Sequence, residues 1–282
     1  MELYNSLINE TKALLESKSA KVWDYDAHGL WKDTGMSELV LQKDAAFELG
    51  ASGKGSANYV LFTSNADLVN KDQVILCGKD LGELKGNCDF ARVVLLRVGV
   101  LDEDDEAVYR TLKDIEFSKY HVYPEGYMVR MSPESYREQI RVSKDALRHG
   151  ISFKSIGMNY ITEYKKDANV ISATVIFMTD PSIDYAKLKA LAKKSADVTG
   201  TLTHILEGLP TDCSVCALKD ICDEVEGMKE LHFGVGEKGA DHPHSQICRE
   251  EPPHRLPTGS IYVRHYAVYV KTKKERINES QV

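Results

Sequence analysis

The sequence predicts an α+β fold with a mixed or antiparallel sheet and packed helices, followed by a cysteine-rich segment that binds a metal cluster. Strand-length runs rich in β-branched residues mix with helical stretches in no strict alternation. Two of the predicted strands, within 159–178, lie too close together for the crossover helix that a parallel pair needs. Three of the six cysteines fall within residues 213–222. That density predicts a metal site rather than scattered thiols.

Composition sets the class of protein. With 43% hydrophobic and 28% charged residues, the chain has the make-up of an ordinary globular protein. Lys and Arg number 36 against 43 for Asp and Glu, a net charge of −7, and no strong basic tract is present. Nucleic acid is therefore not an expected partner. No stretch approaches the roughly 18 consecutive apolar residues of a membrane span, so no membrane contact is expected.

The first 20 residues also bear on the compartment. Charged residues interrupt their apolar positions, unlike the centre of a secretion signal. We therefore expect a cytoplasmic protein. A reducing cytosol keeps thiols free, which makes closely spaced cysteines metal ligands rather than a disulfide framework.

Three parts are predicted along the chain: an N-terminal helical segment (1–46), an α+β domain (47–208) and a Cys/His-rich metal-cluster segment with a C-terminal strand (209–282). Near-helical spacing of apolar residues predicts an amphipathic helix at the N-terminus. Its apolar positions are Leu3, Leu7, Ile8, Leu14 and Leu15.

Within the α+β domain, apolar alternation and turn residues mark the elements in order. Strands are predicted at 59–63, 73–77, 91–98, 138–142, 159–164 and 170–178, and helices from the acidic cluster 102–106 to Ile115, at 144–149 and at 184–206. The acidic cluster suits the positive end of a helix dipole better than a metal site. Ser143 is placed to cap the short helix, and Gly150 to end it. A further strand is predicted at 260–270.

A glycine-rich stretch, FELGASGKGS at 47–56, raises the question of phosphate binding. A P-loop needs its lysine followed by Ser or Thr and then a helix. Here Lys54 is followed by Gly55, and a predicted strand comes next. The stretch is better interpreted as a flexible turn.

The cysteine segment carries the clearest chemistry. Cys213 and Cys216 form a C-x2-C pair, Cys222 follows six residues later, and Cys248 is a remote candidate for a fourth ligand. All-thiolate ligation is typical of iron–sulfur clusters, which predicts a [4Fe–4S] cluster. Zinc is the alternative, and it accepts histidine as readily as cysteine for the fourth position. The candidate histidines are His232, His242, His244, His254 and His265.

The two remaining cysteines have no neighbouring Cys or His. Cys77 follows the apolar run QVIL and is expected to be a small buried hydrophobic residue, and Cys88 is expected to be a loop thiol.

Four stretches in the same order resemble one known family. They are FELG (47–50), NYVLFTSNADLVNKDQVILCGKDLGEL (58–84), IRVSKDALRHG (140–150) and CSVC (213–216). Over residues 47–222 the chain resembles the beta subunit, acetyl-CoA synthase, of the CO dehydrogenase/acetyl-CoA synthase complex. The resemblance implies an acetyl-CoA synthase-like α+β domain associated with coenzyme A and partner contacts. It also implies that Cys213, Cys216 and Cys222 match the first three ligands of the family's [4Fe–4S] cluster.

The chain departs from that family at several positions. The third cysteine comes early, and the next, Cys248, is followed by Arg249 rather than glycine. No Cys-Gly-Cys, which binds the nickel ions in the family, occurs among these residues, and the large nickel-binding domain is not expected. Gln139 stands where the family tends to place an aromatic residue. We therefore expect no intact nickel A-cluster.

The leading hypothesis is an acetyl-CoA synthase-like iron–sulfur protein with an accessory or redox role in anaerobic one-carbon metabolism. Its expected partner is a corrinoid or one-carbon enzyme, or ferredoxin. The alternative is a binding module for acyl-CoA or a nucleotide, with a structural zinc. In that alternative, cations beside the Ser-capped helix face an anionic ligand: Arg141, Lys144 and Arg148, with Lys154 nearby. A third hypothesis is an enzyme whose cluster lies beside His232, His242 or His244.

Overall fold

The computed structural model describes residues 2–16, 18–99, 105–132 and 135–206 of the 282-residue chain. All of them belong to the first of the two units into which the chain divides, Met1–Lys238. The helices are α1 (Glu2–Ala13), α2 (Asp105–Phe117), α3 (Lys144–Arg148), α4 (Phe153–Tyr164) and α5 (Tyr185–Leu206), with 3-10 turns at Leu81–Glu83 and Ser118–Tyr120. Among the described residues, no helix combines the length and the apolar character that crossing a membrane requires.

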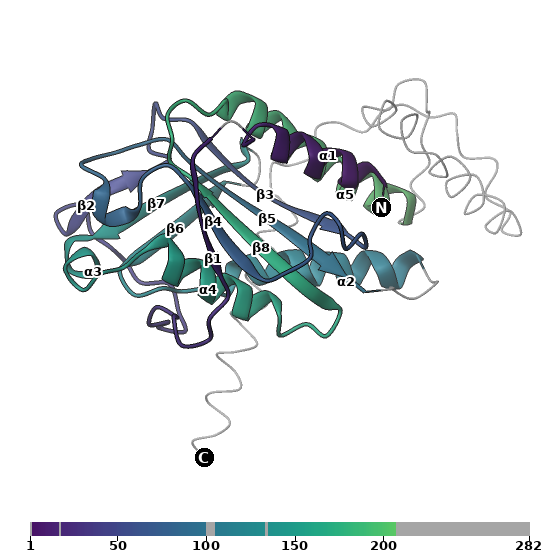
Figure 1. The fold of residues 1–282 in the computed structure, drawn as a ribbon, viewed down its shortest axis with the longest axis horizontal. Helices are drawn as coiled ribbons and strands as arrows, with labels where there is room; N and C mark the ends of the chain where they lie inside the picture. The colour runs from purple at the N-terminus through teal and green to yellow at the C-terminus, as the bar shows by residue number, and fades with distance from the viewer. Residues whose placement is uncertain (1, 17, 100–104, 133–134, 207–282) are drawn as a thin grey trace, which may run out of the picture. The chain divides into compact units, whose positions relative to one another are not determined.

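A five-stranded mixed sheet forms the centre of the described fold (Figure 1). Its order is β1 (Ala20–Asp24), β4 (Gln73–Cys77), β8 (Val170–Met178), β5 (Phe90–Val98) and β3 (Ser56–Thr63). The pairs β4/β8 and β5/β3 are parallel, whereas β1/β4 and β5/β8 are antiparallel. The inner strands are buried along nearly their whole length. Both faces of this sheet are therefore covered.

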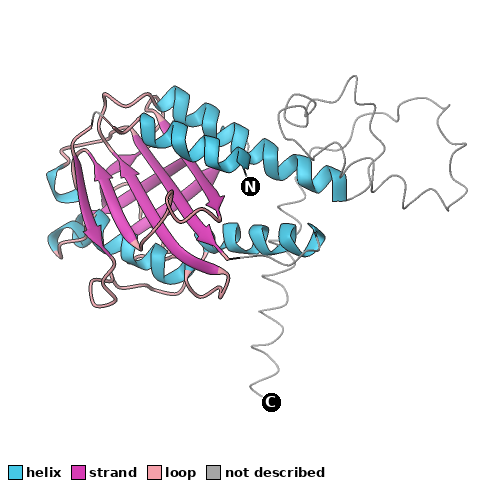
Figure 2. Ribbon diagram, turned by 45° about the vertical axis from the view of Figure 1, so that its right-hand side comes forward, coloured by secondary structure: helices cyan, strands magenta, loops and turns pink. Residues whose placement is uncertain are grey.

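Helices cover the sheet from its two sides (Figure 2). On one side α1 packs with α5 over β3, where Thr11 Oγ1 lies 2.9 Å from the hydroxyl of Tyr59. On the other side α4 packs against β4 and β8, and the ring of Phe153 lies 4.7 Å from that of Phe177. Successive residues of a strand point to opposite faces. One core thus extends through the sheet from α1 to α4.

A second, three-stranded antiparallel sheet has the order β2 (Ala45–Leu49), β7 (Arg137–Ser143) and β6 (Tyr127–Ser132). Its strand β7 contacts β3 and β5 of the first sheet. Ser56 connects the two: its Oγ donates to the carbonyl of Glu138 at 2.7 Å and accepts from the amide of Glu138 at 2.9 Å. This junction fixes where β7 and the following helix α3 lie.

Most of the predicted elements are confirmed: the N-terminal helix, the strands at 59–63, 73–77, 91–98, 138–142 and 170–178, and the helices that became α2, α3 and α5. The α+β class with a mixed sheet is confirmed as well. The glycine-rich stretch forms a turn before β3, although its first residues, Phe47–Leu49, belong to β2.

The strand predicted at 159–164 is wrong. Those residues are the second half of α4, so the expected close strand pair within 159–178 does not form. Their aromatic and β-branched residues resemble a strand, but burial follows a helical period through Phe153, Ile156, Tyr160 and Tyr164. A capping box between Ser152 and Ser155 starts the helix. Its third helical position holds Ser155 instead of the usual Glu or Gln, so the start of this helix has no clear sign in the sequence.

Three strands were not predicted. β1 lies in the segment 1–46, which was expected to be helical, and it joins the main sheet by pairing with β4. The others are β2 and β6 of the second sheet. The predictions for 209–282, including the cysteine segment and the strand at 260–270, lie outside the described residues.

Candidate functional site

The turn from β7 into α3 is built as its sequence predicts. Ser143 ends the strand in extended conformation, and its Oγ accepts a hydrogen bond from the amide of Ala146 at 3.0 Å. Gly150 follows α3 with φ +86°, the left-handed conformation in which glycine ends a helix without strain. The cap fixes the direction of α3 and of the basic side chains around it.

Each of the three predicted anion-binding cations has a partner within the chain. Arg141 forms an ion pair with Glu48 on the adjacent strand β2. Lys144 Nζ donates to the carbonyl of Lys43 at 2.9 Å, and Arg148 pairs with Asp145 at 2.7 Å. Arg148 is 75% exposed, so its pair is weak. The role of these cations in binding an anionic ligand stays a prediction.

Glu48 takes a second hydrogen bond, from Gln139 Nε2 at 2.8 Å. The donated hydrogen bond from Arg141, together with that from Gln139, lowers the pKa of the Glu48 carboxyl. Gln139, which stands where the resembled family tends to place an aromatic residue, therefore helps to hold the ion pair between β2 and β7.

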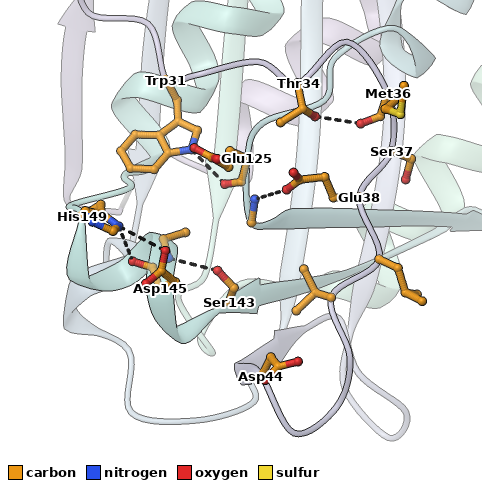
Figure 3. A pocket seen from close by; sticks show the side chains of 14 residues that line it. Trp31, Thr34, Met36, Ser37, Glu38, Asp44, Glu125, Ser143, Asp145 and His149 are labelled. Atoms are coloured by element: carbon orange, nitrogen blue, oxygen red, sulfur yellow. Dashed lines mark hydrogen bonds and ion pairs between the residues drawn. The ribbon is translucent and has the colours of Figure 1, made fainter.

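A pocket of about 640 Å³ opens beside α3, and we call it the α3 pocket (Figure 3). Three separate stretches of the chain line it: Trp31, Thr34, Met36, Ser37, Glu38, Leu39, Val40 and Asp44; Glu125 and Gly126; and Ser143, Asp145, Ala146 and His149. None of the three predicted cations is among the lining residues. The pocket and the predicted anion-binding surface are thus distinct.

Backbone contacts hold the walls of the α3 pocket in place. The indole Nε1 of Trp31 donates to the carbonyl of Glu125 at 2.9 Å, and the amide of Gly126 donates to Glu38 Oε2 at 3.0 Å. Gly126 has φ +70°, and a Cβ there would lie 2.4 Å from Ser143 Oγ. Only glycine fits this position, where β6 begins against the cap of α3.

The α3 pocket is acidic. Glu38, Asp44, Glu125 and Asp145 line it, whereas no lysine or arginine does. Two of these carboxylates have cationic partners that do not line the pocket: Lys32 pairs with Glu125 at 2.6 Å, and Arg148 pairs with Asp145. The hydrogen bond from Arg148 also lowers the pKa of Asp145. Such a pocket favours a cation over the phosphates of a nucleotide or coenzyme A.

A second pocket, of about 420 Å³, lies where the parallel strands β4 and β8 both end. Lys54, Lys79 and Cys88 are among its lining residues. Burial raises the pKa of the Cys88 thiol to about 11, which keeps it protonated at neutral pH. Cys88 is a loop thiol and Cys77 is fully buried, as the sequence predicts.

Sequence reasoning missed one buried ion pair. Arg92 on β5 and Glu138 on β7 lie 3.0 Å apart, and both side chains are wholly inaccessible to solvent. Arg92 also stands 4.0 Å above the ring of Tyr160. The only available signal was an arginine inside an apolar run, and a strand pattern does not say which residue will face it.

Within residues 2–206, as far as they are described, no group of three or more His, Cys, Asp or Glu side chains could hold a metal ion. The predicted ligands Cys213, Cys216, Cys222 and Cys248 lie outside the described residues. The cluster therefore stays a prediction based on their spacing.

A comparison with models of known protein families finds a match that falls almost entirely on described residues. The family model described as CO dehydrogenase/acetyl-CoA synthase complex beta subunit matches residues 35–183, which is more than half of the chain. No curated protein matches the chain significantly. The matched region includes most residues that line the α3 pocket, ends between β8 and α5, and stops before Cys213.

Proposed function

The chain belongs to the CO dehydrogenase/acetyl-CoA synthase complex beta subunit family, and on this basis we propose that it is an iron–sulfur protein with an accessory or redox role. Membership places it with the acetyl-CoA synthase-like proteins of one-carbon metabolism. We further propose that it acts in the cytoplasm of an anaerobic cell. Its proposed partner is a corrinoid or one-carbon enzyme of the CO dehydrogenase complex, or ferredoxin.

The spacing of the cysteines carries the proposal. A C-x2-C pair with a third thiol six residues on supplies three ligands from one short stretch, and Cys248 supplies a fourth. This all-thiolate donor set fits a [4Fe–4S] cluster, which when bound would accept and release one electron at a time. Cys77 and Cys88 belong to no group of three or more potential metal ligands within the described part of the chain, so they are not among the proposed ligands.

The proposed role excludes carbon–carbon bond formation at nickel by these residues themselves. None of the six cysteines forms the Cys-Gly-Cys that holds nickel in the resembled family. The acyl-CoA or nucleotide alternative gains no support from the described residues, because the pocket beside α3 is acidic and the nearby cations have partners within the chain.

Metal and acid-labile sulfide analysis of protein purified without oxygen tests the cluster. We expect about four irons and four sulfides per chain, with an electron paramagnetic resonance signal that changes on reduction by dithionite. Replacing Cys213, Cys216, Cys222 or Cys248 by Ser, one at a time, should lower the iron content. The matched control is Cys88→Ser, a partly exposed thiol outside the proposed set, which should leave it unchanged.

One zinc per chain without sulfide would overturn the cluster and make the cysteines structural. Protein that binds neither iron nor zinc under these conditions would overturn the proposed function as a whole.

A further inference from the structure

The described residues display their exposed apolar side chains unevenly. Seven large apolar side chains are exposed in this part of the protein, and four lie in one segment, residues 30–41. They are Leu30, Met36, Leu39 and Leu41, with Met36 and Leu39 exposed by 70% and 71%. The other three are scattered over β1, α2 and β8. Exposed apolar side chains that lie together on a surface mark a site of interaction, and Met36 and Leu39 of this set line the same pocket.

The 30–41 segment is held against the rest of the protein at several points. The amide of Thr34 donates to the carbonyl of Tyr123 at 3.0 Å, and Asp33 forms a β-bridge with Pro124. The amide of Trp31 donates to Asn159 Oδ1 at 2.9 Å, and Arg141 Nη1 donates to the carbonyl of Val40 at 3.4 Å. The exposed side chains of Met36 and Leu39 are thus presented from an anchored backbone.

This segment also forms one wall of the α3 pocket, where Figure 3 shows Met36 and Glu38 on the same stretch of chain. Met36 and Leu39 line the pocket together with Glu38 and Asp44. Neither Glu38 nor Asp44 has an ion-pair partner among the described residues, unlike Glu125 and Asp145. A ligand that brings a positive charge into the pocket would therefore meet two carboxylates without an ion pair, one of which, Glu38, accepts a hydrogen bond from the amide of Gly126.

We propose that the α3 pocket and the 30–41 segment form a docking surface for a partner protein whose contacting segment carries a lysine or arginine between apolar side chains. The basic side chain enters the pocket toward Glu38 and Asp44, and its apolar neighbours cover Met36 and Leu39. A second copy of this chain is disfavoured as the occupant, because a two-fold contact would bring the same acidic surfaces together. The inference is independent of the iron–sulfur cluster.

A tryptophan reporter tests the proposal at the pocket itself. The chain has two tryptophans, and Trp23→Phe leaves Trp31, whose indole lines the α3 pocket, as the only one. The probe is a synthetic peptide that alternates leucine and arginine; the control peptide has glutamate in place of each arginine. We expect the arginine peptide to change Trp31 fluorescence saturably, with an affinity that falls as salt rises, and the glutamate peptide to leave it unchanged.

Surface variants then separate this site from general charge attraction. Glu38→Gln with Asp44→Asn should weaken binding about fivefold or more, since two ion pairs are lost. Met36→Ser with Leu39→Ser should weaken it as well. The matched controls are Asp67→Asn and Ile171→Ser, an exposed carboxylate and an exposed apolar residue away from the pocket, which should bind as the parent does.

Three results would each overturn the proposal: equal binding of both peptides, binding that Glu38→Gln with Asp44→Asn leaves unchanged, or self-association in sedimentation that these variants abolish. The last would assign the surface to a second copy. The pocket variants should retain the iron and sulfide content of the parent. If the parent protein binds no peptide but contains iron and sulfide, the docking proposal fails and the cluster stands. If it binds the peptide but contains no iron or sulfide, the cluster fails and the docking proposal stands.

Discussion

Arg92 and Glu138 place two opposite charges where solvent does not reach either side chain. Only one contact joins them directly, from Arg92 Nε to Glu138 Oε2 at 3.0 Å. Both Nη atoms of Arg92 and the Oε1 of Glu138 have no hydrogen-bond partner within the described residues. Burial raises the pKa of Glu138 in spite of the neighbouring guanidinium. Burying the pair therefore costs free energy, and removing only one of the two partners costs more.

Replacing Glu138 by Gln should lower the free energy of unfolding by about 3–5 kcal/mol, because it leaves the Arg92 charge buried without a counter-charge. Urea denaturation followed by circular dichroism measures the loss. Asp24→Asn is the control, because it removes one partner of the exposed pair with Lys71 and should cost less than about 1 kcal/mol. A similar small loss for Glu138→Gln would show that the buried pair is not charged.

The ion pair between Glu48 and Arg141 gives stability a defined pH dependence. Because hydrogen bonds from Arg141 and Gln139 lower the pKa of Glu48, its contribution is complete above the unfolded pKa of about 4.3 and is lost as the pH falls through the lower folded pKa. Glu48→Gln should therefore cost roughly 1 kcal/mol at neutral pH, and the difference from the parent should shrink below about pH 4. Denaturant midpoints across that range measure it, and a difference independent of pH would contradict the assignment.

At the scale of single elements, helix α4 depends on a glycine for its contact with the sheet. Gly157 faces β4, and a Cβ at this position would lie 2.5 Å from a methyl group of Val74. Glycine ordinarily weakens a helix by about 1 kcal/mol relative to alanine. Close packing against a fully buried valine accounts for it here.

Gly157→Ala should lower the free energy of unfolding by about 1–3 kcal/mol, because the overlap with Val74 exceeds the gain in helix propensity. Gly157→Ala should cost less stability when it is made in the Val74→Ala variant than when it is made in the parent protein. A double-mutant cycle by urea denaturation measures the coupling. Additive losses would show that α4 does not meet β4 at this residue.

Local patterns predicted the elements whose burial and period agree with their composition. The strands at 73–77 and 91–98, and the helix capped by Ser143, are of this kind. The prediction for residues 159–164 failed because their composition favours a strand, whereas tertiary packing makes them part of a helix. The α3 pocket escaped prediction because its walls come from three separated stretches, and pairing between them leaves no local signal.

At the scale of the whole described fold, the N-terminal helix belongs to the core rather than to an appendage. Leu7 and Ile8 on α1 are fully buried, and they belong to the same cluster as the sheet residues Leu61 and Leu95. The hydroxyl of Tyr59 further links β3 to Thr11 of the helix. Removing the contacts of α1 should therefore lower the free energy of unfolding of the whole region from α1 to α5.

Ile8→Ala should lower the free energy of unfolding by about 2–5 kcal/mol while unfolding of this region stays a single transition. Leu39→Ala, at a side chain that is 71% exposed, is the control and should cost far less. Differential scanning calorimetry measures both. A separate early transition caused by Ile8→Ala would instead show that α1 melts independently of the sheet.

The position of β8 has a consequence for synthesis on the ribosome. Although β8 is the last strand of the described chain, it lies in the middle of the five-stranded sheet, between β4 and β5. Until Val170–Met178 has left the exit tunnel, the nascent chain holds two separate half-sheets, β1/β4 and β5/β3, each with an open inner edge. Open strand edges invite pairing with other chains. The protein is thus most in need of a chaperone during the interval between the emergence of β5 and that of β8.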